Sequence, residues 1–301
     1  MAIANKIRLS HSSLDTLHSC ERKFELYKLL QGEGNEKEDT EHTVFGKAFG
    51  AGCQSYLEYQ DKERALFAAW LEYWPIVEAK NKTQSSCIAI LERAFFALDT
   101  LLMEYELVSF NGKSATELSF CLHIDQDFYF VGHIDAVLRH RFTGQYLVLD
   151  FKTTGLQILD LNPLYKHSGQ CLGYSIALDR IVGKTLADYG VMYFVAQLGK
   201  TFGEAKMHVL TYEKTLLDRF NWFLTLGLDV KHLHEMMELG VFPKRASACL
   251  SFMRPCPHFG TCHLHGFDAP KKREVDELEY DFEYQLDDII QDHLARMTTE
   301  E

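Results

Sequence analysis

The sequence predicts an α/β fold in which a mixed central sheet is flanked by helices, with an N-terminal helical block and a C-terminal cysteine segment. Three observations predict it. Residues from about 44 to 108 follow helical periodicity, and three stretches rich in β-branched and aromatic residues come next. A helix, two more such stretches and a long closing helix complete the order. This alternation is typical of a sheet covered by helices.

The first predicted helix is the stretch "SHSSLDTLHSCERKFELYKLL", with an N-cap at Ser12 or Ser13 and Cys20 inside it. A polar, glycine-containing loop follows. The helical block then consists of three stretches with apolar residues at helical spacing: "FGKAFGAGCQSYLEYQ", "ERALFAAWLEYW" and "SSCIAILERAFFALDTLLMEYEL".

The next three stretches are predicted strands: "ATELSFCLHI", "FYFVGHIDAVLRH" and "QYLVLDFKTT". The connection "RFTGQ" between the second and third is short and contains Gly144, so these two strands are expected to form an antiparallel hairpin. The remaining predicted elements are a helix, two strands and a helix: "GQCLGYSIALDRIVG", "YGVMYFVAQLG", "AKMHVLTY" and "EKTLLDRFNWFLTLGLDVKHLHEMMELG".

Length and charge limit the class of protein. The chain has 301 residues, of which 47% are hydrophobic, and this suits one elaborated α/β domain or a domain with an insertion. A net charge of −12 argues against a uniformly basic DNA-coating protein, but not against a nuclease whose carboxylates hold metal ions. Part of the negative charge lies in "REVDELEYDFEYQLDDIIQDH", which is predicted as a solvated amphipathic helix. No run approaches ~18 apolar residues, so we expect a soluble, cytoplasmic protein.

A pair of carboxylates is the strongest candidate for a chemical site. The midpoint between Asp135 and Asp150 falls between Phe142 and Thr143, inside the predicted turn. In a regular hairpin this register places the two carboxylates opposite each other. Because adjacent carboxylates repel, such a pair needs a cation or a shared proton. Hard oxygen ligands of this kind suit Mg²⁺ or Mn²⁺.

Four further residues extend the candidate site. Lys152 shares a strand face with Asp150 and is expected to orient the attacking water or help to deprotonate it. Glu117 lies on the preceding strand and is expected to reach the same end of the sheet. Gln170 and Tyr174 share one helical face, where they can bond a phosphate or order the loop around the site. Asp-x-Lys alone is usually an exposed ion pair, so the hypothesis depends on the whole ordered series.

The stretches "GHID", "DFK" and "QCLGY" resemble successive core motifs of the PD-(D/E)XK nucleases, in particular the RecB-like branch. The resemblance runs from about residue 115 to 178 and implies a restriction-endonuclease-like fold. It implies that Asp135 and Asp150 hold a divalent metal ion and that Lys152 assists the attacking water. It also implies that Glu117 supports the metal site and that Gln170 and Tyr174 form the downstream motif of the branch.

One position departs from the pattern of that branch. RecB-like members commonly carry an early helix of the form Gly-x-x-x-His, whose histidine can reach the metal. Here the stretch "FGKAFGAGCQSYLE" has Gly46 at the glycine and Gly50 where the histidine would stand. Close helix packing is the plain interpretation of Gly46, Gly50 and Gly52. Absence of the histidine puts metal occupancy and cleavage mode in question.

The segment "ACLSFMRPCPHFGTCHLHG" holds Cys249, Cys256 and Cys262, and Cys20 is far away in sequence. One N-terminal and three C-terminal cysteines around a nuclease core resemble the iron–sulfur subgroup of the family, seen in AddB-type and CRISPR-adaptation nucleases. The resemblance implies a [4Fe–4S] cluster that joins the two ends of the chain. Structural zinc is the alternative, held by four thiolates or by three with one of the nearby histidines: His258, His263 or His265.

The other four cysteines fall in predicted helices or strands and are expected to be small core residues: Cys53, Cys87, Cys121 and Cys171. The expected organisation is a nuclease domain over residues 1–266 and an acidic tail over 267–301. Within the domain, the helical block covers about 44–108, the catalytic core about 114–240, and the cluster-binding segment 249–262 together with Cys20.

The leading hypothesis is a Mg²⁺- or Mn²⁺-dependent DNA exonuclease that acts on single strands or on ends. The resemblance implies a phage or bacterial role in DNA recombination, repair or processing, within the bacterial cytoplasm. No helicase motif is evident, so a helicase or recombination protein is a candidate partner, and a homo-oligomer is compatible with the sequence. The alternative is a non-catalytic DNA-binding or assembly module. A small-molecule hydrolase finds no support, because neither a Gly-x-Ser-x-Gly elbow nor a Walker phosphate loop is present.

Overall fold

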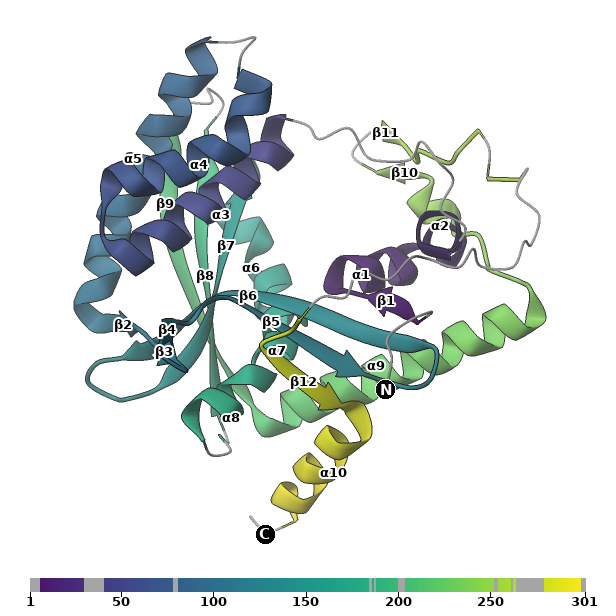
Figure 1. Ribbon diagram of the computed structural model, residues 1–301. Helices are drawn as coiled ribbons and strands as arrows, with labels where there is room; N and C mark the ends of the chain where they lie inside the picture. Colours follow the sequence, from purple (N-terminus) through teal and green to yellow (C-terminus); the bar gives the residue numbers. More distant parts are fainter. Residues whose placement is uncertain are drawn as a thin grey trace. The chain divides into compact units, whose positions relative to one another are not determined.

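The computed structural model describes residues 6–29, 41–77, 81–183, 186, 188–199, 204–251, 254–260, 262–263 and 279–298. The predicted architecture, a mixed central sheet with flanking helices, is confirmed (Figure 1). The chain divides into two compact units. The first unit contains residues 1–37, 120–132 and 220–301, and the second contains residues 38–119 and 133–219.

The second unit carries most of the sheet. Its strands are β2 (Tyr105–Leu107), the end of β6 (Phe128–His140), β7 (Tyr146–Thr154), β8 (Asp188–Leu198) and β9 (Ala205–Thr215). The β6–β7 and β8–β9 pairs are antiparallel, whereas β7 and β8 are parallel. The predicted hairpin is therefore confirmed. Gly144 has φ +72° in its turn, a conformation that a glycine adopts without steric cost.

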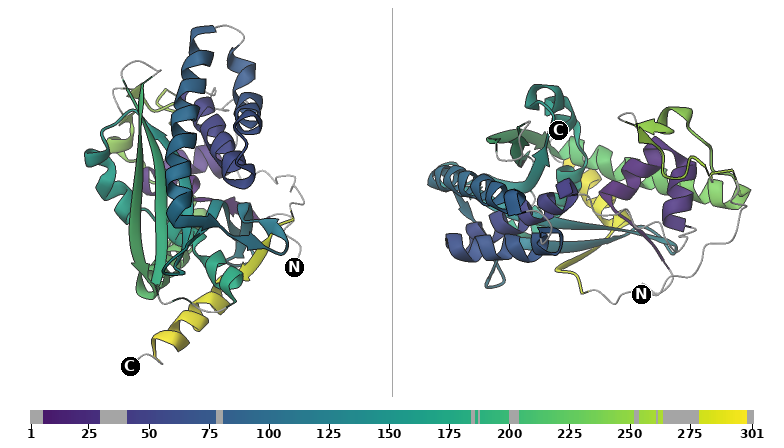
Figure 2. Two further views of the ribbon diagram at one scale, coloured as in Figure 1. Left: turned by 90° about the vertical axis from the view of Figure 1, so that its left-hand side faces the viewer. Right: turned by 90° about the horizontal axis from the view of Figure 1, so that it is seen from above.

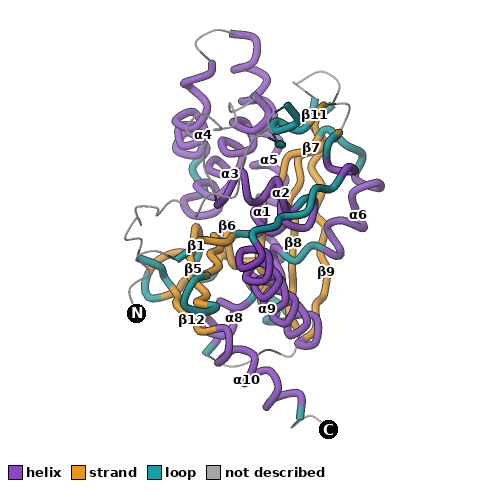
Figure 3. Tube along the Cα trace, turned by 90° about the vertical axis from the view of Figure 1, so that its right-hand side faces the viewer, coloured by secondary structure: helices purple, strands orange, loops and turns teal. Residues whose placement is uncertain are grey.

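Helices cover both faces of this part of the sheet (Figures 2 and 3). On one face lie α3 (Glu41–Tyr59), α4 (Lys62–Val77) and α5 (Asn81–Glu104), and on the other lies α6 (Ile158–His167). The chain continues from α6 into α7 (Gln170–Tyr174) and α8 (Ile176–Val182). Because both faces of β8 are covered, its interior is almost continuously buried and apolar rather than alternating.

The core on the α3–α5 side fixes which way each side chain of β7 points. Phe49 of α3 stacks on Phe194 of β8 and meets the edge of Phe151 of β7, with ring centroids 6.2 and 6.4 Å apart. Leu147 and Leu149 join Phe151 in this core. Since successive side chains of a strand point to opposite faces, Asp150 and Lys152 are directed to the other face.

The first unit contains the chain ends. β1 (Ile7–Leu9) pairs in parallel with the beginning of β6, and β12 (Phe282–Gln285) pairs in parallel with the end of β5 (Thr116–His123). Its helices are α1 (His11–Ser19), α2 (Glu21–Phe24), the latter part of α9 (Leu216–Leu239) and α10 (Leu286–Met297). The short strands β10 (Leu250–Ser251) and β11 (Arg254–Pro255) form a hairpin. Because β5 and β6 pass from one unit into the other, hydrogen-bonded neighbours follow the order β12-β5-β6-β7-β8-β9.

Two sequence-based expectations about the chain ends are wrong in detail. The first helix begins after an N-cap at Ser10, where Ser10 and Ser13 form a capping box, and it stops at Cys20, whose backbone is extended. The acidic stretch near the C-terminus is not one helix, because Phe282–Gln285 forms β12 before α10 begins. Phe282 and Tyr284 are buried while the residues after each of them are exposed, which is the period of a strand. Residues 267–278 and 299–301 of the expected tail lie outside the described residues.

One short hairpin and two short helical turns complete the described elements. β3 (Ser109–Phe110) and β4 (Lys113–Ser114) pair with each other, and a π-helical turn (Glu25–Leu29) follows α2. A 3-10 turn (Ala246–Ala248) precedes β10. No helix within the described ranges has both the length and the apolar composition needed to cross a membrane.

Two glycines of α3 are expected to respond in opposite ways to alanine. A Cβ at Gly52 would meet Leu91 at 3.0 Å and Ala69 at 3.2 Å, whereas a Cβ at Gly50 meets nothing within 4 Å. Gly52→Ala should therefore lower the free energy of unfolding by about 1–3 kcal/mol through overpacking. Gly50→Ala should raise it by about 0.5–1 kcal/mol, because alanine loses less backbone entropy in a helix. Denaturant unfolding of both variants measures this, and changes of the same sign would contradict the packing described.

Candidate active site

Asp135 and Asp150 lie opposite each other across the β6–β7 hairpin. The register pairs Ala136 with Leu149, so the next pair along the two strands is Asp135 and Asp150. The predicted register is therefore confirmed. Asp135 Oδ2 also accepts the backbone N–H of Phe151 at 2.8 Å. This hydrogen bond fixes one carboxylate against the strand that carries the other.

Lys152 contacts Asp150 rather than projecting into solvent. Its Nζ lies 2.7 Å from Asp150 Oδ2, and the side chain of Asp150 is only 2% exposed. Burial alone would lower the pKa of Lys152, but the charge of Asp150 and its hydrogen bond, with a smaller effect from Asp135, raise that pKa above its usual range. The Asp-x-Lys pair thus joins a buried carboxylate to a partly buried lysine, and it is not the exposed ion pair that the pattern alone favours.

The electrostatics of the pair act most clearly on Asp135. Burial and the charge of Asp150 raise its pKa to about 7, and the charge of Glu117 contributes in the same direction. The Phe151 N–H and the charge of Lys152 oppose this shift but do not cancel it. Two carboxylates that share one face in this way favour a proton or a cation between them.

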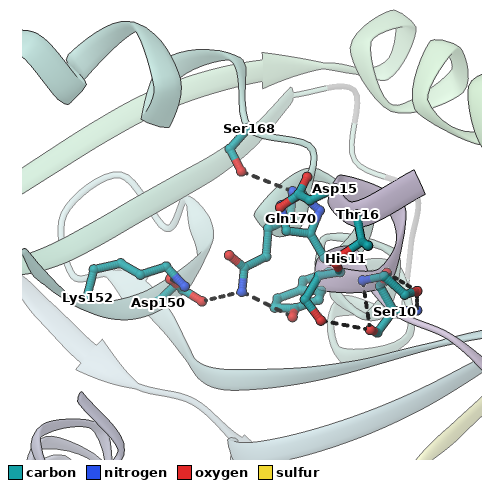
Figure 4. Close-up of polar contacts among 11 residues, drawn as sticks. Ser10, His11, Asp15, Thr16, Asp150, Lys152, Ser168 and Gln170 are labelled. Carbon is teal, nitrogen blue, oxygen red and sulfur yellow. Dashed lines mark hydrogen bonds and ion pairs between the residues drawn. The ribbon is translucent and has the colours of Figure 1, made fainter. Parts of the chain in front are cut away.

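Gln170 and Tyr174 belong to the same site. Gln170 Nε2 donates to Asp150 Oδ1 at 3.1 Å and is 3.2 Å from the hydroxyl of Tyr174 (Figure 4). Ser168 fixes the start of α7, because its hydroxyl accepts the backbone N–H of Gln170 at 3.2 Å. The predicted helical face of Gln170 and Tyr174 is therefore directed at the carboxylates, and the side-chain amide holds Asp150 from one side while Lys152 holds it from the other.

Glu117 lies close enough for its charge to act on Asp135, although its own side chain is exposed. Its backbone has φ +51° within β5, a left-handed conformation that costs about 1–3 kcal/mol for a residue with a side chain. Strained backbone of this kind occurs often at functional sites. The observed conformation is therefore compatible with a supporting role for Glu117 in the candidate site.

The glycines of α3 differ in their surroundings. Gly52 is closely packed, as expected, and a Cβ at Gly46 would meet the side-chain oxygen of Thr153 on β7 at 3.3 Å. Gly50 is not a packing glycine, because nothing lies within 4 Å of a Cβ at that position. The position at which the resemblance expects histidine therefore has room for a side chain.

Two tyrosines next to the carboxylates were not predicted from the sequence. Tyr193 on β8 is the register partner of Asp150, and its ring packs on Tyr165 of α6 with centroids 4.8 Å apart. Both are affected by the site, since burial raises the pKa of each tyrosine and the charge of Asp150 adds to the shift. Only the parallel register of β7 and β8 reveals this neighbourhood, and no sequence motif marks it.

A second group of possible metal ligands, in the first unit, was also not predicted: Asp125, Asp127 and His234. Their ligand atoms lie within 4.8 Å of one another. Asp125 Oδ1 accepts the N–H groups of Asp127 and Phe128, and its Oδ2 lies 2.7 Å from His234 Nε2. These hydrogen bonds join the β5–β6 turn to α9, and this structural role explains the cluster without a metal ion.

The C-terminal cysteines are arranged by the β10–β11 hairpin. Its register pairs Leu250 with Pro255, so Cys249 and Cys256 are the next opposed pair, and the N–H of Cys256 donates to the carbonyl of Cys249 at 2.8 Å. Opposed residues of an antiparallel pair point to the same face. Cys262 follows in the next turn, where its N–H donates to the carbonyl of His258 at 2.7 Å.

The residues after Cys20 hold this segment from the N-terminal side. The Arg22 guanidinium donates to the carbonyl of Cys262 at 3.3 and 3.4 Å, and it also pairs with the buried Glu25. Glu21 pairs with Arg245, four residues before Cys249. The segment after Cys20 therefore contacts the segment that carries the three C-terminal cysteines, and all eight cysteines of the chain are free.

The remaining four cysteines are buried, as predicted: Cys53, Cys87, Cys121 and Cys171. Burial raises the pKa of Cys53 and of Cys171, in both cases with a contribution from the carboxylates of the candidate site. Both thiols are therefore held in the neutral form, which suits packing rather than ligation.

The carboxylate repulsion predicts a pH effect on stability in the absence of metal. The pKa of Asp135 is about 7 in the folded protein and near 3.8 when unfolded, so the native state binds more protons between these values. Stability should fall as pH rises through this window. Asp135→Asn keeps an acceptor for Phe151 and removes the titration. Unfolding is measured in EDTA for the variant and for wild type. The free energy of unfolding of the variant minus that of wild type should increase by at least about 1 kcal/mol from pH 5 to pH 8.

The matched control is Asp188→Asn, at an exposed carboxylate at the start of β8. Its stability should follow the wild-type curve across the same pH range. If the Asp135→Asn curve also ran parallel to wild type, the repulsion between the two carboxylates would not be what limits stability at high pH.

Comparisons with known proteins agree with the arrangement of the carboxylates in the site. The sequence matches the PD-(D/E)XK nuclease superfamily over residues 8–263. A crystal structure of a "putative exonuclease" from Eubacterium rectale is similar in fold, with a TM-score of 0.52, 13% sequence identity and 91% of each chain covered. No curated protein matches the chain. Because the family match spans most of the sequence and includes both facing aspartates, the protein belongs to the PD-(D/E)XK nuclease superfamily.

Proposed function

We propose that the protein is a Mg²⁺- or Mn²⁺-dependent deoxyribonuclease, and more specifically an exonuclease that acts on single-stranded DNA or on DNA ends. One observation carries the proposal. Asp135 and Asp150 face each other across the hairpin, and Lys152 and Gln170 both hold Asp150. This is an arrangement of hard oxygen donors with a cation and an amide beside them.

The residues fit a divalent metal ion. The raised pKa of Asp135 means that the metal-free site favours a proton where a cation would bind, and carboxylate oxygens are the ligands that Mg²⁺ and Mn²⁺ prefer. Asp135 and Asp150 would hold the ion, with Glu117 in a supporting position. When bound, the metal would polarise the phosphodiester and activate water as a nucleophile.

The chain's own side chains have distinct tasks in this reaction. The attacking water forms a new P–O bond as the bond from phosphorus to the leaving ester oxygen breaks. The water gives up a proton, and the leaving oxygen acquires one. Lys152 supplies positive charge on the carboxylate face, where it orients the water and offsets the charge that develops on the phosphate. Gln170 and Tyr174 position the Asp150 carboxylate through the amide hydrogen bond.

Exonuclease action is supported by the name of the structural neighbour and by the resemblance to the RecB-like branch. A role in DNA recombination, repair or processing, together with a separate helicase, rests on the same analogy. The rival candidate is a DNA-binding or assembly module without catalysis. Gly50 favours this rival, because the position expected to carry a metal-reaching histidine has no side chain.

A cleavage assay distinguishes the two candidates. Anaerobically purified protein should degrade end-labelled linear single-stranded DNA when Mg²⁺ or Mn²⁺ is present. Asp150→Asn should reduce this rate by at least about a hundredfold, since the variant loses a metal ligand and the partner of Lys152. Asp188→Asn, at an exposed carboxylate on the neighbouring strand, should cleave as wild type does.

Covalently closed circular DNA separates the modes of attack. An exonuclease leaves the circle intact, while cleavage of both substrates assigns the same chemistry to an endonuclease. If wild type degrades neither substrate, or if Asp150→Asn is as active as wild type, the catalytic proposal is wrong. Retained DNA binding in that case would support the non-catalytic module.

We also propose that Cys20, Cys249, Cys256 and Cys262 hold a [4Fe–4S] cluster that joins the chain ends. The support is that Cys249 and Cys256 are opposed in a hairpin and that Arg22, two residues after Cys20, donates to the carbonyl of Cys262. Four thiolates without a carboxylate suit a soft metal or a cluster. Zinc remains the alternative for the same donor set.

Metal analysis tests this assignment. Anaerobically purified wild type should contain iron and acid-labile sulfide and should absorb visible light as iron–sulfur proteins do. Cys256→Ser should lose both signals, and Cys121→Ser, at a buried cysteine outside the set, should keep them. Stoichiometric zinc without sulfide would assign the four cysteines to zinc, and wild type without either would overturn the metal site.

A further inference from the structure

The sheet face that carries Lys152 continues past the candidate active site as a run of polar side chains. The next residue of β7 on this face is Thr154, whose register partner on β8 is Gln197. Gln197 is in turn the partner of Lys206 on β9. The opposite face of these strands packs on α3–α5, so the row Thr154, Gln197 and Lys206 lies on the side of the carboxylates.

Two more residues form a hydrogen-bonded chain with Gln197 in the middle of this row. His208 of β9 lies 3.0 Å from Gln197 Oε1 through its Nε2, and Gln197 Nε2 donates to Gln157 Oε1 at 3.0 Å. Burial and the charge of Lys206 lower the pKa of His208, so the neutral ring is the donor to Gln197. The relay therefore ends at the exposed amide of Gln157, just before α6, with its NH₂ group as a further donor.

The group is chemically suited to an anion. We call it the polar track: Thr154, Gln157, Gln197, Lys206 and His208. It presents an ammonium, an amide and a hydroxyl, and it contains no carboxylate. Lys206 is exposed and makes no ion pair with any residue in the described part of the chain. Lysine, glutamine and threonine side chains of this kind supply many of the contacts to phosphate oxygens in protein–DNA complexes.

The distance from the candidate active site fits a strand of DNA. Lys206 is displaced from Lys152 by two inter-strand spacings of ~4.8 Å across the sheet and by one two-residue repeat of ~6.7 Å along the strand. These two displacements are perpendicular, so the diagonal distance is about 12 Å. One strand of duplex DNA rises ~3.4 Å per nucleotide, so this span corresponds to about four nucleotides or fewer. A strand whose scissile phosphate lies at Lys152 can therefore place its neighbouring phosphates over the track.

We propose that the polar track binds the backbone phosphates of the DNA strand next to the scissile phosphate. The proposal rests on the proposed nuclease function and adds the path of its substrate. The strand leaves the carboxylates across the ends of β7 and β8 and reaches β9 at Lys206. Because the track contacts phosphates and not bases, the binding is independent of DNA sequence.

DNA binding without cleavage tests the track. Full-length protein in EDTA is titrated into a short fluorescent single-stranded oligonucleotide at several salt concentrations, and anisotropy reports the affinity. Lys206→Gln should weaken binding about two- to fivefold at low salt and reduce the salt slope by about one. Gln197→Glu should weaken binding further, because it places a carboxylate in the middle of the track.

The matched control is Lys62→Gln, at an exposed lysine of α4 in the helical block on the other side of the sheet. It should bind DNA with the wild-type affinity and salt slope. Thermal melting of each variant checks that it is folded, and the cleavage assay should show a higher KM for Lys206→Gln with an unchanged kcat.

The outcomes separate the track from the proposed function. If wild type binds and cleaves DNA while Lys206→Gln and Lys62→Gln behave alike, the track is overturned and the nuclease proposal stands. If wild type neither binds nor cleaves DNA, the proposed function fails and the track fails with it. If Lys206→Gln alone loses affinity in a protein that does not cleave, the track is a DNA-binding surface of a non-catalytic module.

Discussion

Two carboxylates facing each other across the β6–β7 hairpin are the constraint on which the site depends. Burial and mutual repulsion raise the pKa of Asp135, so this part of the fold is destabilised when both groups are charged. Three contacts offset the repulsion: the N–H of Phe151, the ammonium of Lys152 and the amide of Gln170. Each of these groups is fixed by a strand or a helix. The arrangement is therefore maintained in the absence of a cation and is complementary to one.

The alternation of side chains along β7 places the residues of the apolar core on one face of the strand and the charged residues of the candidate site on the other. Leu147, Leu149 and Phe151 face the helical block and form a close-packed core with Phe49, while Asp150 and Lys152 face α7. A shift of one residue in the register would exchange the two sets, burying the charges in the apolar core. The core on one face therefore determines the register that holds the charges on the other.

The sequence was most informative where a local period decides the structure. The spacing of Asp135 and Asp150 about a short turn predicted their opposition, and the four-residue spacing of Gln170 and Tyr174 predicted one helical face. Features that depend on distant pairing were not predictable in this way. Tyr193 meets Asp150 only through a parallel register set by a helical crossover, and the short acidic stretch that forms β12 gains its structure from β5. Its two-residue alternation is too brief to outweigh the helical periodicity that follows it.

Net charge and local charge have different consequences for a protein that handles DNA. At −12 the whole chain repels a polyanion at long range, so the overall field does not concentrate DNA near the site. Screening suppresses this repulsion beyond about 8 Å at physiological ionic strength, so contacts between individual groups within that distance dominate. The track places one ammonium and neutral hydrogen-bond donors there, rather than many cations. Binding through such a surface releases few counterions, so the affinity for DNA is low. A low affinity also allows the product to dissociate readily. This balance suits the exonuclease proposed above, which has to release its product after each cleavage.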